Sequence, residues 1–311
     1  MPTTTLRTQA RRLVADTIHH LPTDRGKWRL AGIAGRMLVE AAPVGTHCDV
    51  ARIPGGSTMY VDLSDLFQRH IYFAGLYERH LTNLFQRLLR PGDTFVDGGA
   101  NIGYFTILGS ALVGPAGTVH SFEPIPATFA ALRANVAMNA LTQAHLNQMA
   151  LADKAGELSF EVPVDAETGN ALGWAATTVR MGRGPTITVP AGTLDDYAAS
   201  HLLASIRLAK LDLEGGELAA IAGMASLLRE RRIEYLCCEV NHFLLDNAGI
   251  PREALFSAMA GFGYTCFQIG ENLRAMPPLH QETASAAVTH GGDYLFVAPG
   301  VAEPHGLLSR R

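Results

Sequence analysis

The stretch FVDGGANIGYF, residues 95–105, places an acidic residue directly before a cluster of glycines. Gly98, Ala100 and Gly103 nearly match the dinucleotide fingerprint G-x-G-x-x-G/A, which would indicate hydride transfer with a nicotinamide. Counted from Asp97, the same stretch nearly matches D-x-G-x-G-x-G, which would indicate methyl transfer from S-adenosylmethionine. The glycines alone do not separate the two, because either ligand needs a close approach of the backbone.

Asp97 separates the two cofactors. A dinucleotide presents a pyrophosphate to the turn and to the N-terminus of the following helix, where a carboxylate would repel it. S-adenosylmethionine instead carries an ammonium and a sulfonium, which a carboxylate attracts. Glu123, which ends the next expected strand, can accept both hydroxyls of an adenosine ribose, but both cofactors contain that ribose. Asp97 therefore favours methyl transfer over hydride transfer.

Acidic residues end four of the expected strands. Asp97 ends the first, Glu123 the second, Asp212 and Glu214 the fourth, and Glu239 the fifth. Ligands of doubly wound sheets bind outside the carboxyl ends of the strands, so we expect the active site on this rim. Asp212 and Glu214 are two residues apart along a strand and are therefore expected to point the same way.

The polar residues after the fifth strand supply further candidates. Asn241 and His242 follow Glu239 directly, and a neutral imidazole near pH 7 can take the proton of a hydroxyl. The predicted general base is His242, Glu239, Glu214 or Asp212. Oxygens of Asp212, Glu239 and Asn241 also suit Mg²⁺, so the sequence leaves a magnesium-dependent reaction open without requiring one.

The elements that must position these residues form an alternating pattern. From residue 94 onward, apolar strands alternate with helices, which predicts a doubly wound, mostly parallel α/β sheet. The last two strands have no helix between them and must pair antiparallel. The expected strands are TFVDGG, GTVHSFEP, AHLNQMALA, IRLAKLDLE, IEYLCCEV, YTCFQI and DYLFVAP, seven in all. The expected helices of this part lie at 102–112, 128–140, 216–232 and 251–261, with one more beginning at Thr193 as N-cap.

The segment before this pattern has a different character. Helical spacing up to about residue 45 predicts one or two helices, residues 47–63 predict a β-hairpin, and 74–90 predict a helix. We therefore expect a segment 1–64 that acts as a lid or a dimer contact, a cofactor-binding domain 65–300, and a tail 301–311. Alternating stretches rich in glycine predict an antiparallel ribbon inserted at about 157–190.

Composition excludes several classes of protein. The net charge is −4, so a nucleic-acid partner has no electrostatic support. No apolar run has the length of a signal peptide or a membrane helix, so we expect a soluble, cytoplasmic protein without a membrane partner. The four cysteines lack zinc-type spacing and fit reduced thiols.

Several blocks of the chain together resemble the FkbM-type methyltransferases, from about residue 65 to about 299. The blocks are FVDGGANIGYFT, FEPIPATFAALRANVAMNA, NQMALADKAGELSF, TLDDY, IRLAKLDLEGGELAAIAG and CCEVN. The resemblance implies a class I, Rossmann-like methyltransferase fold with a seven-stranded sheet. It also implies an S-adenosylmethionine-dependent O-methyltransferase, of the kind that tailors polyketides, sugars and other secondary metabolites, including antibiotics.

The resemblance also implies which residues hold the cofactor. The turn residues Asp97, Gly98, Gly99, Ala100, Asn101 and Gly103 would wrap its methionine and ribose parts. Glu123, followed by Pro124, would hold the ribose, Ala150 would flank the adenine, and Tyr77 and Glu78 would contact the amino-acid end. Gly98 stands where the family commonly has valine, and we expect it to loosen the strand end slightly.

The leading hypothesis is therefore in-line transfer of a methyl group to a hydroxyl of a small molecule, with a homodimer left open. The alternatives are an NAD(P)-dependent Rossmann oxidoreductase and a non-catalytic nucleoside-binding protein. The segments expected to select the acceptor are the N-terminal helices, the ribbon and residues 270–292.

Overall fold

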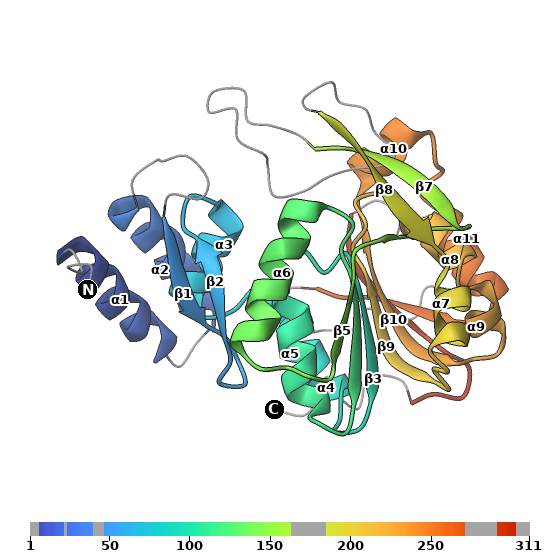
Figure 1. The fold of residues 1–311 in the computed structure, drawn as a ribbon, viewed down its shortest axis with the longest axis horizontal. Helices are drawn as coiled ribbons and strands as arrows, with labels where there is room; N and C mark the ends of the chain where they lie inside the picture. The colour runs from blue at the N-terminus through green and yellow to red at the C-terminus, as the bar shows by residue number, and fades with distance from the viewer. Residues whose placement is uncertain (1–5, 22–23, 40–46, 163–184, 271–290, 303–311) are drawn as a thin grey trace.

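A seven-stranded sheet forms the centre of the computed structural model, which describes residues 6–21, 24–39, 47–162, 185–270 and 291–302. The strand order is β11-β12-β10-β9-β3-β4-β5 (Figure 1). The strands are β3 (Thr94–Gly98), β4 (Thr118–Phe122), β5 (Ala144–Asn147), β9 (Ile206–Leu211), β10 (Ile233–Val240), β11 (Thr265–Gln268) and β12 (Gly292–Val297). Only β12 runs antiparallel to its neighbours, β10 and β11. The predicted fold class, with one antiparallel strand in a parallel sheet, is confirmed.

Helices cover both faces of this sheet (Figure 1). On one face lie α4 (Arg79–Leu88), α5 (Tyr104–Val113) and α6 (Pro126–Met138), and on the other lie α7 (Leu194–Ser200), α8 (Glu217–Ala222), α9 (Ala225–Arg229) and α11 (Ala254–Gly261). Strand residues alternate between the two cores: Phe95 and Leu208 pack with α4 and α5, whereas Val96 and Ala209 pack with the opposite helices. Both faces are buried, which explains the nearly continuous apolar strands.

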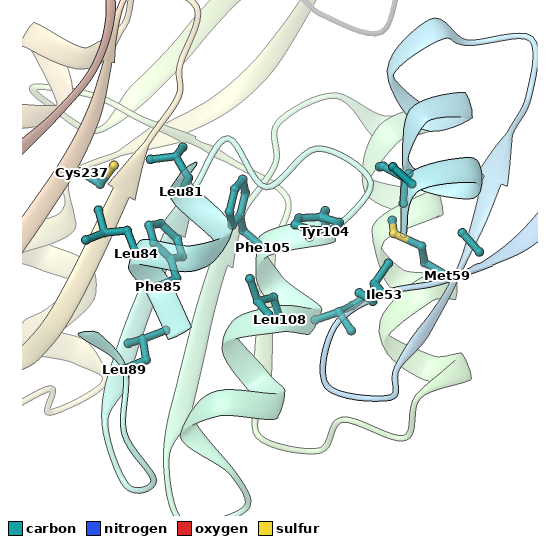
Figure 2. Packing of buried hydrophobic residues seen from close by; sticks show 14 of the residues in the cluster. Ile53, Met59, Leu81, Leu84, Phe85, Leu89, Tyr104, Phe105, Leu108 and Cys237 are labelled. Carbon is teal, nitrogen blue, oxygen red and sulfur yellow. The ribbon is translucent and has the colours of Figure 1, made fainter. Parts of the chain in front are cut away.

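The N-terminal segment packs onto the α5–α6 side of the sheet. It consists of α1 (Leu6–His19), α2 (Asp24–Leu38) and the antiparallel hairpin of β1 (Cys48–Arg52) and β2 (Thr58–Asp62), and α3 (Leu66–Ala74) follows it. Figure 2 shows Ile53 and Met59 of the hairpin region beside Tyr104 and Leu108 of α5, in one continuous core. The predicted helices and hairpin are confirmed.

Polar contacts also attach the hairpin. The side-chain amide of Asn135 on α6 accepts a hydrogen bond from the backbone N–H of Tyr60 (2.6 Å), and that of Asn139 accepts one from Thr58 (2.9 Å). The Asn139 amide also donates to the Thr58 carbonyl (2.6 Å). These side chains satisfy backbone groups of β2 that no further strand pairs with.

A second, small sheet holds the predicted ribbon. β8 (Thr186–Gly192) pairs antiparallel with β7 (Gly156–Glu161) and parallel with β6 (Ala150–Leu151). The expected single strand AHLNQMALA is therefore wrong: its first half is β5 of the main sheet, and its second half is β6 of the small one. The middle of the ribbon, 163–184, most of the 270–292 segment and most of the tail lie outside the described residues.

Two helix predictions are corrected, and two helices were not predicted. The helix expected at 74–90 begins only at Arg79, because Gly75, with φ of 73°, ends the unpredicted helix α3. The helix expected at 216–232 is split into α8 and α9 at Gly223, where a Cβ would lie 1.9 Å from the Ala152 carbonyl oxygen. A further unpredicted helix, α10 (His242–Ala248), follows β10. No helix in the described ranges is long and apolar enough to span a bilayer.

Candidate active site

A cavity of about 1180 Å³ lies at the carboxyl ends of β3, β4, β9 and β10. The start of α3, the small sheet, the first turn of α8 and α10 also contribute to its wall. Eleven of the predicted cofactor and catalytic residues line it: Tyr77, Glu78, Gly99, Ala100, Asn101, Glu123, Pro124, Ala150, Asp212, Glu214 and Glu239. Four do not line it: Asp97, Gly98, Gly103 and His242. The rim expected from the strand-end acids is therefore where the structure places the cavity.

The turn after β3 is fixed by backbone contacts. The N–H groups of Gly99 and Ala100 both donate to the Phe122 carbonyl, each at 3.0 Å. Gly99 has φ of 74°, and a Cβ there would lie 1.9 Å from the Asp212 carbonyl oxygen. Only glycine fits at this position, because both the positive φ and the close contact with the backbone after β9 exclude a side chain.

Glu123 joins this turn to the end of β4. One carboxylate oxygen accepts from the Asn101 N–H (3.0 Å) and the other from the Ile125 N–H (2.9 Å). Burial raises the pKa of Glu123 to about 7, although both hydrogen bonds favour the charged form. Each carboxylate oxygen keeps a further lone pair, so Glu123 can also accept hydroxyl groups of a ligand in the cavity.

The two other predicted glycines have packing roles. Gly103, with φ of 98°, begins α5, and a Cβ there would lie 2.6 Å from Cδ1 of Leu132. At Gly98, a Cβ would lie 3.0 Å from both the Lys210 carbonyl oxygen and Cδ2 of Leu211. The strand end is closely packed there, so the expectation that Gly98 loosens it is wrong.

Asp97 is fully buried and does not line the cavity. It accepts a hydrogen bond from Oγ1 of Thr106 (2.7 Å), while its other oxygen has no hydrogen-bond partner. Burial raises the pKa of Asp97, against the opposing effect of its cross-strand neighbour Lys210. The prediction that Asp97 contacts the ligand directly is therefore not supported, because this face of β3 is covered by α5.

Lys210 is the centre of the charge cluster beside the cavity. It is only 3% exposed, its Nζ donates to Asp212 (2.9 Å), and it lies 5.1 Å from the centre of the Phe105 ring. Asp212, Asp97 and Glu78 together raise the pKa of Lys210 despite its burial. The ammonium group is thus held charged by the carboxylates around it.

Asp212 and Glu239 form a carboxyl pair. A side-chain hydrogen bond joins them, which requires one proton between the two groups. Burial and the neighbouring Asp212 charge raise the pKa of Glu239. For Asp212, burial is outweighed by Lys210 and by the hydrogen bond from Glu239, which lower its pKa. Asp212 is therefore the ionised member and Glu239 the protonated one.

Glu214 reaches the cavity by another route than expected. β9 ends at Leu211, and Glu214 lies in the following turn with φ of 51°. The argument from strand alternation is therefore wrong, although Glu214 and Asp212 both line the cavity. Burial and the Asp212 charge raise the pKa of Glu214 to about 7.

The turn between α3 and α4 brings two more predicted residues to the cavity. Glu78 has φ of 38°, and a side-chain hydrogen bond connects it to Tyr77. The ring of Tyr77 packs edge-on against Tyr104, with 5.8 Å between centroids. Burial raises the pKa of Glu78 to about 7, against the attraction of Lys210. One buried carboxylate oxygen of Glu78, Oε2, has no hydrogen-bond partner.

Comparison with known proteins identifies the family. Residues 97–266, more than half of the chain, match the Methyltransferase FkbM domain. The 31-O-demethyl-FK506 methyltransferase FkbM of Streptomyces tacrolimicus is 30% identical over 263 residues, which cover 76% of this chain and 96% of that protein. The chain belongs to the FkbM methyltransferase family. The expected resemblance is confirmed, and membership of a methyltransferase family decides against the nicotinamide oxidoreductase.

Solved structures give more distant similarities to this FkbM-family chain. The methyltransferase FkbM of Methylobacillus flagellatus KT has 13% identity and a TM-score of 0.41, over 75% of this chain and 55% of that one. The fibrillarin of Aeropyrum pernix, solved with natively bound S-adenosylmethionine, has 12% identity and a TM-score of 0.40, over 84% and 100% of the two chains.

His242 is the predicted base that the structure does not bring to the cavity of the FkbM-family chain. The preceding residue, Asn241, caps α10 by accepting from the Leu244 N–H (3.4 Å), and His242 is the first residue of that helix. Asn241 and Phe243 line the cavity, whereas His242 does not. Its assignment as the base is therefore not supported, because His242 begins the unpredicted helix and does not line the cavity.

The oxygens considered for magnesium are already engaged. Asp212 is paired with Lys210 and with Glu239, and the Asn241 oxygen caps α10. A dication would also lie close to the Lys210 ammonium, which would repel it. Within the described ranges, no group of three or more His, Cys, Asp or Glu side chains is placed to hold a metal. The arrangement therefore does not fit a metal site.

Sequence reasoning missed the aromatic side chains of the cavity wall. Phe67 of α3 and Phe243 of α10 line it and are 60% and 59% exposed. Both lie on the two unpredicted helices, so no pattern connected them with the strand-end acids. Glu217, the first residue of α8, accepts from the N–H groups of Leu213 (2.7 Å) and Gly215 (3.1 Å) and fixes the turn that carries Glu214.

Proposed function

We propose that this FkbM-family methyltransferase is an S-adenosylmethionine-dependent O-methyltransferase that methylates a hydroxyl group of a small molecule. The observation that carries the proposal is the cavity, which has the ribose-type acceptor Glu123 on one side and the carboxyl pair Asp212–Glu239 on another. At about 1180 Å³ it exceeds the roughly 300–1,000 Å³ typical of a pocket for one small ligand. Donor and acceptor would therefore occupy it together.

The donor side fits S-adenosylmethionine by its chemistry. Glu123 would accept the ribose hydroxyls, and the turn at Gly99 and Ala100 lets the ligand approach the backbone. Glu78 would accept from the ammonium of the methionine part, since its buried Oε2 has no donor among the described residues. Ala150, buried at the cavity wall, would contact the adenine.

The acceptor side would supply the base. S-adenosylmethionine contributes a methyl group on a sulfonium, a leaving group that departs as a neutral thioether. Asp212, the ionised member of the pair, would take the proton of the acceptor hydroxyl as its oxygen bonds to the methyl carbon. Glu239, which keeps the shared proton, would orient the acceptor oxygen. Holding both reactants in line can lower the barrier by roughly 7–11 kcal/mol.

The similarity to a methyltransferase named for 31-O-demethyl-FK506 supports a hydroxyl acceptor of the secondary-metabolite kind. On this basis we assign the chain to the tailoring of a polyketide, a sugar or a similar metabolite. α3, which follows the N-terminal segment and lines the cavity, would act as part of a lid over the acceptor.

Two measurements test the proposal. Calorimetric titrations with S-adenosylhomocysteine and with NAD should give binding of the first only; binding of NAD alone would end the proposal. Turnover is measured at saturating donor as the mass gain of one methylene unit, over a panel of glycosides, polyketides and phenols. It should fall at least 100-fold in Asp212→Asn, roughly the contribution of a general base. Glu157→Gln, an exposed change on β7, is the control and should keep wild-type turnover. Wild-type turnover in Asp212→Asn would remove the base assignment.

A further inference from the structure

The charged side chains of the cavity wall are nearly all of one sign. Among the described residues that line it there are seven acidic side chains and one basic side chain. The basic one is Lys210, although the chain as a whole carries 25 lysines and arginines against 29 acids. No arginine or histidine of the described part of the chain lines the cavity. The wall is thus selectively acidic rather than a sample of the overall composition.

The single cation is not available to a ligand. Lys210 is 3% exposed and donates to Asp212 at 2.9 Å, with Asp97 as its cross-strand neighbour. Its charge is therefore balanced within the protein. An anionic group in the cavity would face Glu214 and the Asp212–Glu239 pair without a described counter-charge, and burying such an unpaired charge is strongly unfavourable.

The rest of the acceptor side is apolar. Phe67 and Ile71 of α3 and Phe243 of α10 line the wall. Phe67 and Phe243 remain more than half exposed, so a ligand would cover a large apolar area there. Burial of such rings on binding favours a ligand with an extended apolar body.

We infer that the methyl acceptor is an uncharged or amine-bearing molecule with an apolar body, and that acceptors carrying phosphate, sulfate or carboxylate are rejected. The inference rests on the proposed function, since it assigns the second occupant of the cavity as the acceptor. An ammonium group on the acceptor would be neutralised by Glu214, whose carboxyl lies on the wall. A phosphorylated or nucleotide-linked acceptor would find no such partner.

Two fluorescent probes of matched shape test this inference directly. N-phenyl-1-naphthylamine is uncharged, and 8-anilinonaphthalene-1-sulfonate has the same aromatic body with one sulfonate. Each is titrated into the full-length protein saturated with S-adenosylhomocysteine. We expect the neutral probe to bind and the sulfonate to bind at least about tenfold more weakly at the same site, since one unpaired charge is expected to cost a tenfold change or more.

Variants assign the binding to the cavity. Phe243→Ala and Phe67→Ala should each weaken binding of the neutral probe, whereas Leu202→Ala, a change at an 88% exposed leucine outside the cavity, should not. In each titration, the binding signal that is lost in Phe243→Ala is taken as binding in the cavity, and only this part is compared between the two probes. Glu214→Arg should restore binding of the sulfonate, because it supplies the missing cation.

The outcomes separate this inference from the proposed function. Equal binding of the two probes at the Phe243-sensitive site overturns it, and so does failure of the neutral probe to bind there. Failure of S-adenosylhomocysteine to bind in the first step instead removes the proposed function, whatever the probes do.

Discussion

Replacement of Lys210 by methionine removes the charge at the centre of the site while keeping an apolar stem of similar length. Lys210 donates to Asp212 at 2.9 Å and stands opposite Asp97 in the β3–β9 pairing. Asp97 is fully buried, and one of its oxygens already lacks a hydrogen-bond donor. Without Lys210, the buried carboxylates lose their counter-charge.

The expected loss of stability is large. Removing one partner of a buried ion pair costs about 3–5 kcal/mol. A lower bound of about 3 kcal/mol, at about 2 °C per kcal/mol for a chain of this length, predicts a fall in Tm of roughly 6 °C or more near pH 8. The loss should shrink on acidification. Lys210 lowers the pKa of Asp212. The stability that this ion pair contributes is therefore fully present at pH values above the ordinary pKa of an aspartate, and it is lost as the pH falls through the lowered pKa of Asp212.

Thermal unfolding of the ligand-free protein at about pH 8 and about pH 3 checks both parts, because Asp212 loses its charge only below the ordinary aspartate range. Lys154→Met is the matched control, because Lys154 is exposed and the same atoms are changed. The control should unfold within about 1 °C of the wild type. If Lys210→Met unfolded with the control at pH 8, or if its deficit were independent of pH, the assignment of Lys210 as the counter-charge of the buried acids would be refuted.

Three further predictions concern the donor side. Gly99→Ala should abolish binding of S-adenosylhomocysteine and should lower Tm by more than the control Gly92→Ala does. Both glycines have positive φ, but only at Gly99 does a backbone oxygen stand where the added Cβ would lie. Equal effects of the two substitutions would mean that the backbone conformation alone matters. Glu123→Gln should weaken that binding by about tenfold in calorimetry, the value of a hydrogen bond to a charged group, whereas the exposed change Glu157→Gln should not alter it. Glu78→Gln should raise the Tm of the ligand-free protein above about pH 7 and leave it unchanged near pH 4.5, because the raised pKa of Glu78 means that its favourable contribution to stability is lost as pH rises through about 7. A Tm difference that persists at low pH would contradict this assignment of the pKa. The same substitution should also weaken binding of the donor.

The donor side was predictable because it is local in sequence. The turn around Gly99 and the acid Glu123 belong to one strand–helix–strand unit, in which the chemistry of the residues and their spacing determine their neighbours. Their positions at the carboxyl rim of the sheet followed from the parallel topology alone. What the pattern did not give was depth: Asp97 lies one residue before the end of β3, shares the face of Phe95 and is covered by α5.

His242 shows why the base could not be chosen from the sequence. An imidazole directly after a strand end is a reasonable base only if the chain continues as a loop over the ligand. Here Asn241 instead caps a helix, which directs its neighbours Phe243 and His242 differently. Short helices depend on tertiary packing more than on propensity, so neither α3 nor α10 had a clear periodic signal.

The acceptor side is assembled from distant parts of the chain, and this has a consequence for specificity. Phe67, Glu214 and Phe243 come from three separate elements and meet only in the folded protein. A substitution at any one of them changes the wall facing the acceptor without touching the contacts of the Gly99 turn with Phe122 and Glu123. Changes such as Glu214→Arg should therefore alter which acceptor is methylated while donor binding persists, because the two sides share the cavity but not their supporting hydrogen bonds.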